Sequence, residues 1–133
     1  MSIEKEIVYR FYEEIWNNGN KTVIPAILDA SFTFRGSLGD EKQGYEGFIE
    51  YLDMVHNALD NYTCDIKDIV TEQSKAFAKV KFTGLHKSTF LGVEPTGKNL
   101  SWVAAALFGF KDNNIISLWV LGDLKSLESQ LNG

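Results

Sequence analysis

The sequence predicts an α+β domain in which helices pack on one face of a strongly curved antiparallel sheet. Two observations support this class. Up to Leu59 the apolar side chains mostly recur at helical spacing, whereas from Tyr62 onward they alternate as in strands. Helices that precede a run of antiparallel strands are typical of α+β folds. The length of 133 residues suits one domain, which we assign to residues 1–133.

Three helices are expected before the four later strands of the sheet. Their expected ranges are residues 3–15, 22–30 and 45–59. Ser2 is a suitable N-cap for the first helix, and the polar run Asn17–Asn20 is a stop signal after it. Pro25 lies near the start of the second helix, where its missing N–H costs little.

Strands are expected wherever apolar and polar residues alternate. The expected ranges are residues 31–35, 62–70, 76–90, 99–110 and 115–123. Gly36–Asp40 ends the first of these strands, and turn signals such as Lys111–Asn114 separate the later ones. A short C-terminal helix is expected from Leu124 to Leu131.

Two of the strands are apolar on both faces. In residues 99–110, Trp102 and Phe108 point one way while Val103 and Leu107 point the other. An antiparallel sheet normally leaves one polar face to solvent. Something must therefore cover the second face, and a second copy of the chain is the simplest candidate. We expect a homodimer through the sheet face.

The composition argues against several kinds of partner. The formal net charge is −5, which disfavours non-specific binding to nucleic acid or to an anionic membrane. No apolar run is long enough to span a bilayer, and the N-terminus lacks the apolar region of a signal peptide. Cys64 is the single cysteine, so no internal disulfide can form. A cytoplasmic protein is the default expectation.

Asp123 is the first candidate for catalysis. It ends the last expected strand and shares strand parity with Trp119 and Leu121, which suggests that it looks into an apolar interior. A carboxylate in such a place is costly to ionise and is suited to proton transfer. The residue also directly precedes Leu124 and is a good N-cap for the C-terminal helix. Spacing alone favours the cap, and the two roles are compatible.

His86 and Arg35 are the other polar candidates. His86 shares parity with Phe82, so it also can project to the inner face, where an imidazole suits proton transfer near neutral pH. A hydrogen-bonded structural histidine is the alternative. Arg35 follows two phenylalanines and precedes a glycine-rich break, so it can bind a carboxylate or enolate oxygen at a pocket mouth. A surface ion pair with Asp40 or Glu41 is equally compatible with the sequence. The two histidines have no metal-ligand spacing, and no metal site is expected.

Three segments carry a resemblance to a known family. They are the opening Phe11–Gly19, the Gly84–Lys98 segment with its Gly-Leu-His and Pro-Thr-Gly-Lys ends, and the Ile116–Asp123 ending with Gln130-Leu131 after it. In this order they resemble the SnoaL-like polyketide cyclases over nearly the whole chain. Leu85 departs from the family pattern, which usually has threonine before the histidine.

The resemblance implies a cone-shaped fold of the nuclear transport factor 2-like superfamily with a deep internal pocket. It also implies a reaction without cofactor, in which Asp123 is the general acid–base of an intramolecular aldol ring closure and His86 assists or orients. Phe82, Trp102 and Trp119 would form pocket walls for a small apolar carbonyl compound. The order of elements fits such chemistry, because enolisation needs a base in a dry pocket.

Three functions remain open from the sequence. The first is a cofactor-independent cyclase, isomerase or hydrolase with Asp123 and His86 in the site. The second is a non-catalytic module that holds a small apolar ligand in the same pocket. The third is a dimerising interaction domain with a filled cone, which a structure without a cavity beside these two residues would favour.

Overall fold

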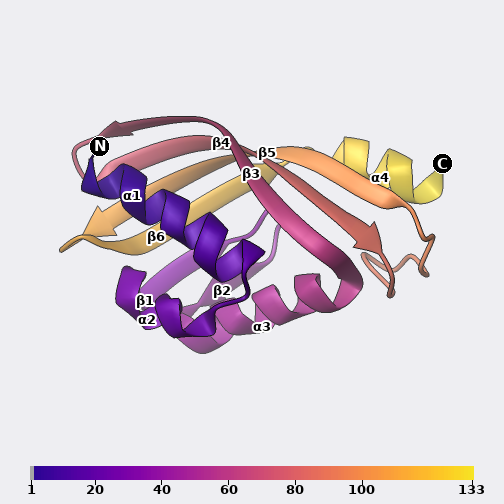
Figure 1. The fold of residues 1–133 in the computed structure, drawn as a ribbon, viewed down its shortest axis with the longest axis horizontal. Coiled ribbons are helices and arrows are strands. Elements are labelled where there is room, and N and C mark those ends of the chain that lie inside the picture. Colours follow the sequence, from indigo (N-terminus) through magenta and orange to yellow (C-terminus); the bar gives the residue numbers. More distant parts are fainter. Residues whose placement is uncertain (1) are drawn as a thin grey trace.

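A computed structural model describes residues 2–133. The helical elements up to α3 lie on one side of a curved sheet that wraps over them, and α4 lies apart beside β5 at the C-terminal end (Figure 1). The helical elements are α1 (Ile3–Arg10), the π-helix η1 (Phe11–Asn17), the 3₁₀-helix η2 (Lys21–Val23), α2 (Ile24–Ile27), α3 (Gly44–Ala58) and α4 (Leu124–Asn132). The strands are β1 (Leu28–Arg35), β2 (Glu41–Gln43), β3 (Leu59–Glu72), β4 (Lys75–His86), β5 (Asn99–Lys111) and β6 (Asn114–Gly122). The expected α+β class is confirmed.

The strands form one open sheet in the order β2-β1-β6-β5-β4-β3. Neighbouring strands are antiparallel except for β1 and β6, which run parallel. The expectation of a purely antiparallel sheet is therefore wrong at this pair. A parallel pair needs a long crossover connection. Here that connection holds β2, α3 and three long strands, so no local pattern could reveal the pairing.

The first helix changes its geometry after Arg10, where the α-helix passes into a π-helix of seven residues. Ser2 caps its start by accepting a hydrogen bond from the backbone N–H of Lys5, as the sequence predicts. At the other end the Asn17 side chain donates to the carbonyl of Cys64 at 2.9 Å and accepts from its N–H at 2.7 Å. These two bonds fasten the end of the helix to β3.

The second predicted helix is much shorter than expected. It consists of the 3₁₀ turn and the four residues of α2, and the chain is already extended at Leu28. Pairing with β6 draws Leu28 into the sheet opposite Ile115. The Asp29 carboxylate then accepts bonds from the N–H and hydroxyl of Ser31, which favours a local turn over a helix. The short strand β2 was not predicted.

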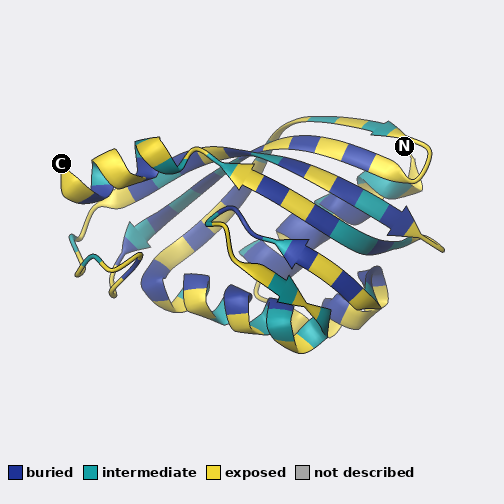
Figure 2. Ribbon diagram, turned by 180° about the vertical axis from the view of Figure 1, so that it is seen from behind, coloured by how far each residue is buried: buried dark blue, intermediate teal, exposed yellow. Residues whose placement is uncertain are grey.

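The sheet has an inner face toward the helices and an outer face away from them. Buried and exposed residues alternate along the long strands (Figure 2). On β5 the inner residues Trp102 and Phe108 are buried, while the outer residues Val103 and Leu107 are exposed. The core is the space between the inner face and the helices. No helix among residues 2–133 is long and apolar enough to cross a bilayer.

Candidate functional site

A void lies inside the cone, between the helices and the inner face of the sheet. It is lined by Phe11, Tyr12, Trp16, Phe34, Ser37, Tyr51, Tyr62, Phe82, Leu118 and Val120. Its volume is about 10 Å³, about the space that one water needs. The deep pocket implied by the family resemblance is therefore closed here, because aromatic rings fill the cone.

Rings from several elements meet around this void. The π-helix contributes Trp16, which packs edge-on against Tyr51 of α3 at 6.0 Å between ring centroids. Tyr51 in turn packs edge-on against Phe34 of β1 at 5.1 Å. Edge-to-face packing of this kind stabilises a rigid aromatic wall. The ten lining residues include hydroxyl groups but no carboxylate.

Three buried polar atoms in this part of the molecule have no hydrogen-bond partner among the described residues. They are the hydroxyl of Tyr12, Nε2 of His86 and Nε1 of Trp102. Tyr12 lines the void, and burial raises the pKa of its hydroxyl well above the ordinary value. The hydroxyl is therefore neutral and available as a donor. A buried donor without an acceptor costs about 1–3 kcal/mol, so such groups call for an explanation.

His86 is fully buried and is fixed by the loop that follows β4. Its Nδ1 accepts a hydrogen bond from the backbone N–H of Thr96 at 3.1 Å and lies 2.9 Å from the hydroxyl of the same residue. Because Nδ1 is an acceptor, the proton of the neutral ring is on Nε2. His86 does not line the void. Its hydrogen bonds to Thr96 are those of a structural histidine that orders a loop, which is the alternative given by the sequence.

Phe82 and Trp102 face the inside of the cone. Phe82 lines the void. The Trp102 ring packs against the Phe82 ring, with 5.4 Å between the two ring centroids. Trp102 also contacts Phe90, which contacts His86. The structure thus places three of the predicted site residues along one inner wall.

Asp123 lies elsewhere. It is exposed, and its carboxylate accepts a hydrogen bond from the backbone N–H of Ser126 at 3.1 Å, as an N-cap of α4. The cap predicted from spacing is confirmed, whereas the interpretation that Asp123 looks into the interior is wrong. Asp123 does share strand parity with Trp119, but Trp119 lies on the outer face. The catalytic role implied by the resemblance stays a prediction.

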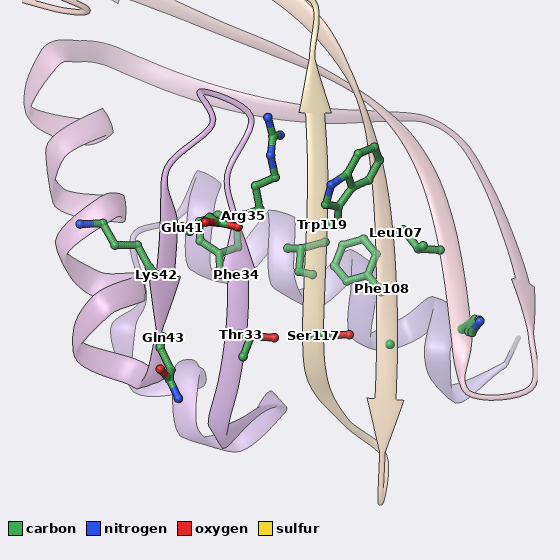
Figure 3. Close-up of a pocket in the computed structure, with 13 residues that line it drawn as sticks. Thr33, Phe34, Arg35, Glu41, Lys42, Gln43, Leu107, Phe108, Ser117 and Trp119 are labelled. Carbon is green, nitrogen blue, oxygen red and sulfur yellow. The ribbon is translucent and has the colours of Figure 1, made fainter.

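Arg35 and Trp119 come together on the outer face, away from the void. The Arg35 guanidinium lies over the Trp119 ring at 5.9 Å from its centroid and donates to the carbonyl of Val120. Both residues line an open groove of about 600 Å³ between β1, β5 and β6 (Figure 3). Trp119 is therefore not a wall of the internal void, and Arg35 is not among the residues that line it.

Sequence reasoning missed the residues that give the void its polar character. Tyr12 falls within the first expected helix, residues 3–15, but the sequence analysis singled out neither it nor Ser37 nor Tyr51. A hydroxyl-bearing aromatic inside an apolar stripe was the available signal. Among residues 2–133, no three His, Cys, Asp or Glu side chains gather in a way that could hold a metal ion.

The curved sheet wrapped over an N-terminal helical layer, with an aromatic void between them, defines the nuclear transport factor 2-like class, also described as the ketosteroid isomerase-like fold. Within this class the chain belongs to the SnoaL-like polyketide cyclase family, whose model matches residues 6–131. The sequence matches none of the curated proteins with which it was compared.

Solved structures agree with this assignment at the level of the fold. A candidate SnoaL-like polyketide cyclase from Jannaschia is 20% identical, with a TM-score of 0.89 over 98% of this chain and 92% of that one. A SnoaL-like polyketide cyclase from Agrobacterium tumefaciens is 18% identical, with a TM-score of 0.82 over 98% and 99%. A Catenulispora acidiphila protein with a ketosteroid isomerase-like fold, solved with trimethylamine, is 17% identical, with a TM-score of 0.80 over 96% and 92%.

Proposed function

We propose that the domain binds a small, neutral, largely apolar compound inside the cone, and that a carbonyl or similar oxygen of this compound accepts a hydrogen bond from Tyr12. The unpartnered hydroxyl of Tyr12 beside the void is the observation that carries the proposal. A core that served only for packing would gain by having phenylalanine at this position, because the orphaned hydroxyl is costly. An acceptor on a ligand removes that cost.

The lining of the void also indicates the class of ligand. Its rings and aliphatic side chains favour an apolar body, and its hydroxyls can hold one or two oxygen atoms. The absence of charged side chains among the lining residues disfavours an ionised ligand, which would lose its hydration without a counter-charge. Entry requires the surrounding rings to move apart, since the space in the closed cone is that of one water.

The residues around the void support binding and not catalysis. Ring closure of the kind catalysed by the family's cyclases needs a base beside the substrate, and the residues around the void include no carboxylate. Asp123 would serve as that base only if substrate reached the exposed start of α4. Replacing Asp123 by Asn keeps the helix cap and removes the base, so a lost turnover in that variant would restore the catalytic hypothesis.

A matched pair of probes tests the binding proposal. Acetophenone carries a carbonyl acceptor, and ethylbenzene has nearly the same shape without one. We expect both to shift amide resonances around the void in NMR titrations, with acetophenone binding more tightly. In Tyr12→Phe, acetophenone should lose about threefold to tenfold in affinity, the value of one neutral hydrogen bond, while ethylbenzene is unchanged. Equal loss for both probes would contradict the role of the hydroxyl.

A packed domain without a ligand is the second candidate, and the small volume of the void favours it. In that case neither probe shifts resonances inside the cone up to its solubility limit. Tyr12→Phe would then raise the free energy of unfolding by about 1 kcal/mol and change nothing else, since it removes only an unsatisfied group.

A further inference from the structure

One part of the wall around the void is a loop and not a helix or a strand. Of the residues that line the void, Ser37 alone lies outside the regular elements, in the loop Gly36–Asp40 that joins β1 to β2. Ser37 is buried, with an exposed fraction of 6%, whereas Gly39 and Asp40 are exposed. The loop therefore has one side against the void and the other against solvent.

The loop lies against the end of β6 and against α3 because two glycines leave room for it. A Cβ atom at position 122 would lie 2.7 Å from the carbonyl oxygen of Ser37, and a Cβ atom at position 36 would lie 2.4 Å from the Tyr51 ring. Both distances are far shorter than an ordinary van der Waals contact. Gly36 and Gly122 are therefore required for this close approach, and any larger residue would push the loop away from the domain.

Few hydrogen bonds hold the loop to the rest of the domain. Two backbone bonds are internal to it, from the N–H of Gly36 to the carbonyl of Asp40 at 2.9 Å and from the N–H of Gly39 to the carbonyl of Gly36 at 3.0 Å. The bond toward α3, from the N–H of Leu38 to the hydroxyl of Tyr51, is 3.4 Å long and therefore weak. The loop can swing outward as a unit and keep its internal bonds.

The chain on either side of the loop is fixed, so the motion is confined to the loop. Arg35 pairs with Glu41 in the β1–β2 register, and its guanidinium donates to the carbonyl of Val120 on β6. The guanidinium also reaches the carbonyl of Gly36, at 3.5 Å, a bond that is equally weak. Gly39 has a φ of +97°, which favours glycine, and together with Gly36 it supplies the backbone freedom that a hinge needs.

We propose that the loop Gly36–Asp40 is a lid over the void, and that it swings outward to admit a ligand. Lifting Gly36 frees the Tyr51 ring, which lines the void, so that the rings of the closed cone gain room to move apart. The entrance then lies beside Gly122, the residue directly before Asp123. The identity of what enters rests on the proposed function, whereas the motion of the lid does not.

Cysteine labelling measures the motion without a ligand. Ser37→Cys places a small reactive side chain on the inner side of the lid, and Cys64, which is 4% exposed, is the reference thiol in the same chain. Iodoacetamide labels each thiol when it becomes exposed, and peptide mass spectrometry follows the two separately. Relative to its rate in concentrated urea, the thiol at position 37 should be protected at least about tenfold less than Cys64, because a loop opens at lower cost than a core strand.

A glycine replacement drives the lid open. In Gly122→Ala on the Ser37→Cys background, the new Cβ meets the carbonyl of residue 37. Labelling at position 37 should then rise by a further ~5-fold to 10-fold, while the rate at Cys64 is unchanged. Gly47→Ala is the matched control, because a Cβ atom at this position in α3 would lie 3.3 Å from the nearest atom of Lys42 and would not touch the lid. It should leave both labelling rates unchanged.

A disulfide bond holds the lid closed. The Cβ of Ser37 lies 3.1 Å from the Cβ position of residue 122. A small outward shift of the loop brings the two positions to the Cβ separation of about 3.5–4.5 Å that a disulfide needs, in the variant Ser37→Cys/Gly122→Cys. In the oxidised form, the entry and release of acetophenone, followed by NMR exchange line shapes, should be at least about 30-fold slower than in the same protein after reduction.

The results separate the lid from the ligand. Equal protection of position 37 and Cys64 would overturn the lid, and so would unchanged acetophenone exchange in the oxidised double variant. Rapid labelling at position 37 in a protein that binds neither acetophenone nor ethylbenzene would support the lid and contradict the proposed function. Near-ultraviolet circular dichroism checks the folding of each variant, and if Gly122→Cys does not fold, the labelling of Ser37→Cys decides alone.

Discussion

The inner and outer faces of β5 differ in a way that separates two roles of the same sheet. Both faces are apolar, yet the inner one is closed by aromatic rings and the outer one is open to solvent. Within residues 2–133, the buried polar side-chain atoms without a hydrogen-bond partner are on the inner side, at Tyr12, His86 and Trp102. Polar groups within a sealed apolar space suit a small ligand, whereas an exposed apolar row suits a protein surface. Apolar character alone therefore does not distinguish a pocket from an interface.

Two neighbouring residues of β5 give the sharpest test of this difference. Phe108 is fully buried on the inner face, and Leu107 is exposed on the outer one. Phe108→Ala should lower the free energy of unfolding by about 3–5 kcal/mol through lost burial and a cavity. Leu107→Ala should cost less than about 1 kcal/mol, since it empties no space in the single chain. Urea unfolding at low protein concentration measures both.

The same pair at high concentration extends the test. If the outer face is an interface, the cost of Leu107→Ala rises with protein concentration, because the dimer stabilises the folded state by mass action. The cost of Phe108→Ala does not depend on protein concentration, because Phe108 is buried on the inner face. If the cost of Leu107→Ala were the same at every protein concentration, the outer face would not be an interface between copies of the chain.

Alkaline pH tests the closed inner side. Burial raises the pKa of Tyr51 to about 12 from an ordinary value of 10.0. The unfolded chain therefore releases this proton first, and stability that is complete below about pH 10 is lost as the pH rises toward 12. One pH unit corresponds to about 1.4 kcal/mol per group, so this tyrosine alone removes roughly 3 kcal/mol.

The matching variant is Tyr51→Phe, which should make the slope of unfolding free energy against pH less steep by about 1.4 kcal/mol per unit between pH 10 and 12. Tyr12 and Tyr62 keep part of the slope, because burial raises the pKa of both. Urea titrations at several pH values measure the slopes. An unchanged slope in the variant would mean that the interior opens to solvent.

Much of the architecture was predictable from local patterns. Strands expected at residues 99–110 and 115–123 are observed at Asn99–Lys111 and Asn114–Gly122, because turn residues bound them clearly. The helix expected after Asp123 begins at Leu124. Capping and alternation depend on a few neighbouring residues, so they can be recognised without a structure.

Which face points inward could not be predicted for β6. Leu118 and Val120 on one side are as apolar as Trp119 and Leu121 on the other. The alternation therefore does not indicate which of the two faces is buried. The choice is made by the parallel pairing with β1, which connects residues far apart in sequence. The placement of the candidate site depended on this choice, and for that reason Trp119 and Asp123 were assigned to the wrong side.

Asp123 follows β6 directly and caps α4, and its replacement by Asn gives the smallest predicted effect. Its N–H donates to the carbonyl of Val103 at 2.9 Å while its carboxylate caps α4. Asp123→Ala should lower the free energy of unfolding by about 1 kcal/mol, and Asp123→Asn by only a few tenths, because asparagine caps equally well. Thermal unfolding of the two variants at the same concentration separates these values. If Asn costs as much as Ala, the charge itself matters, and Asp123 has a role that capping does not explain.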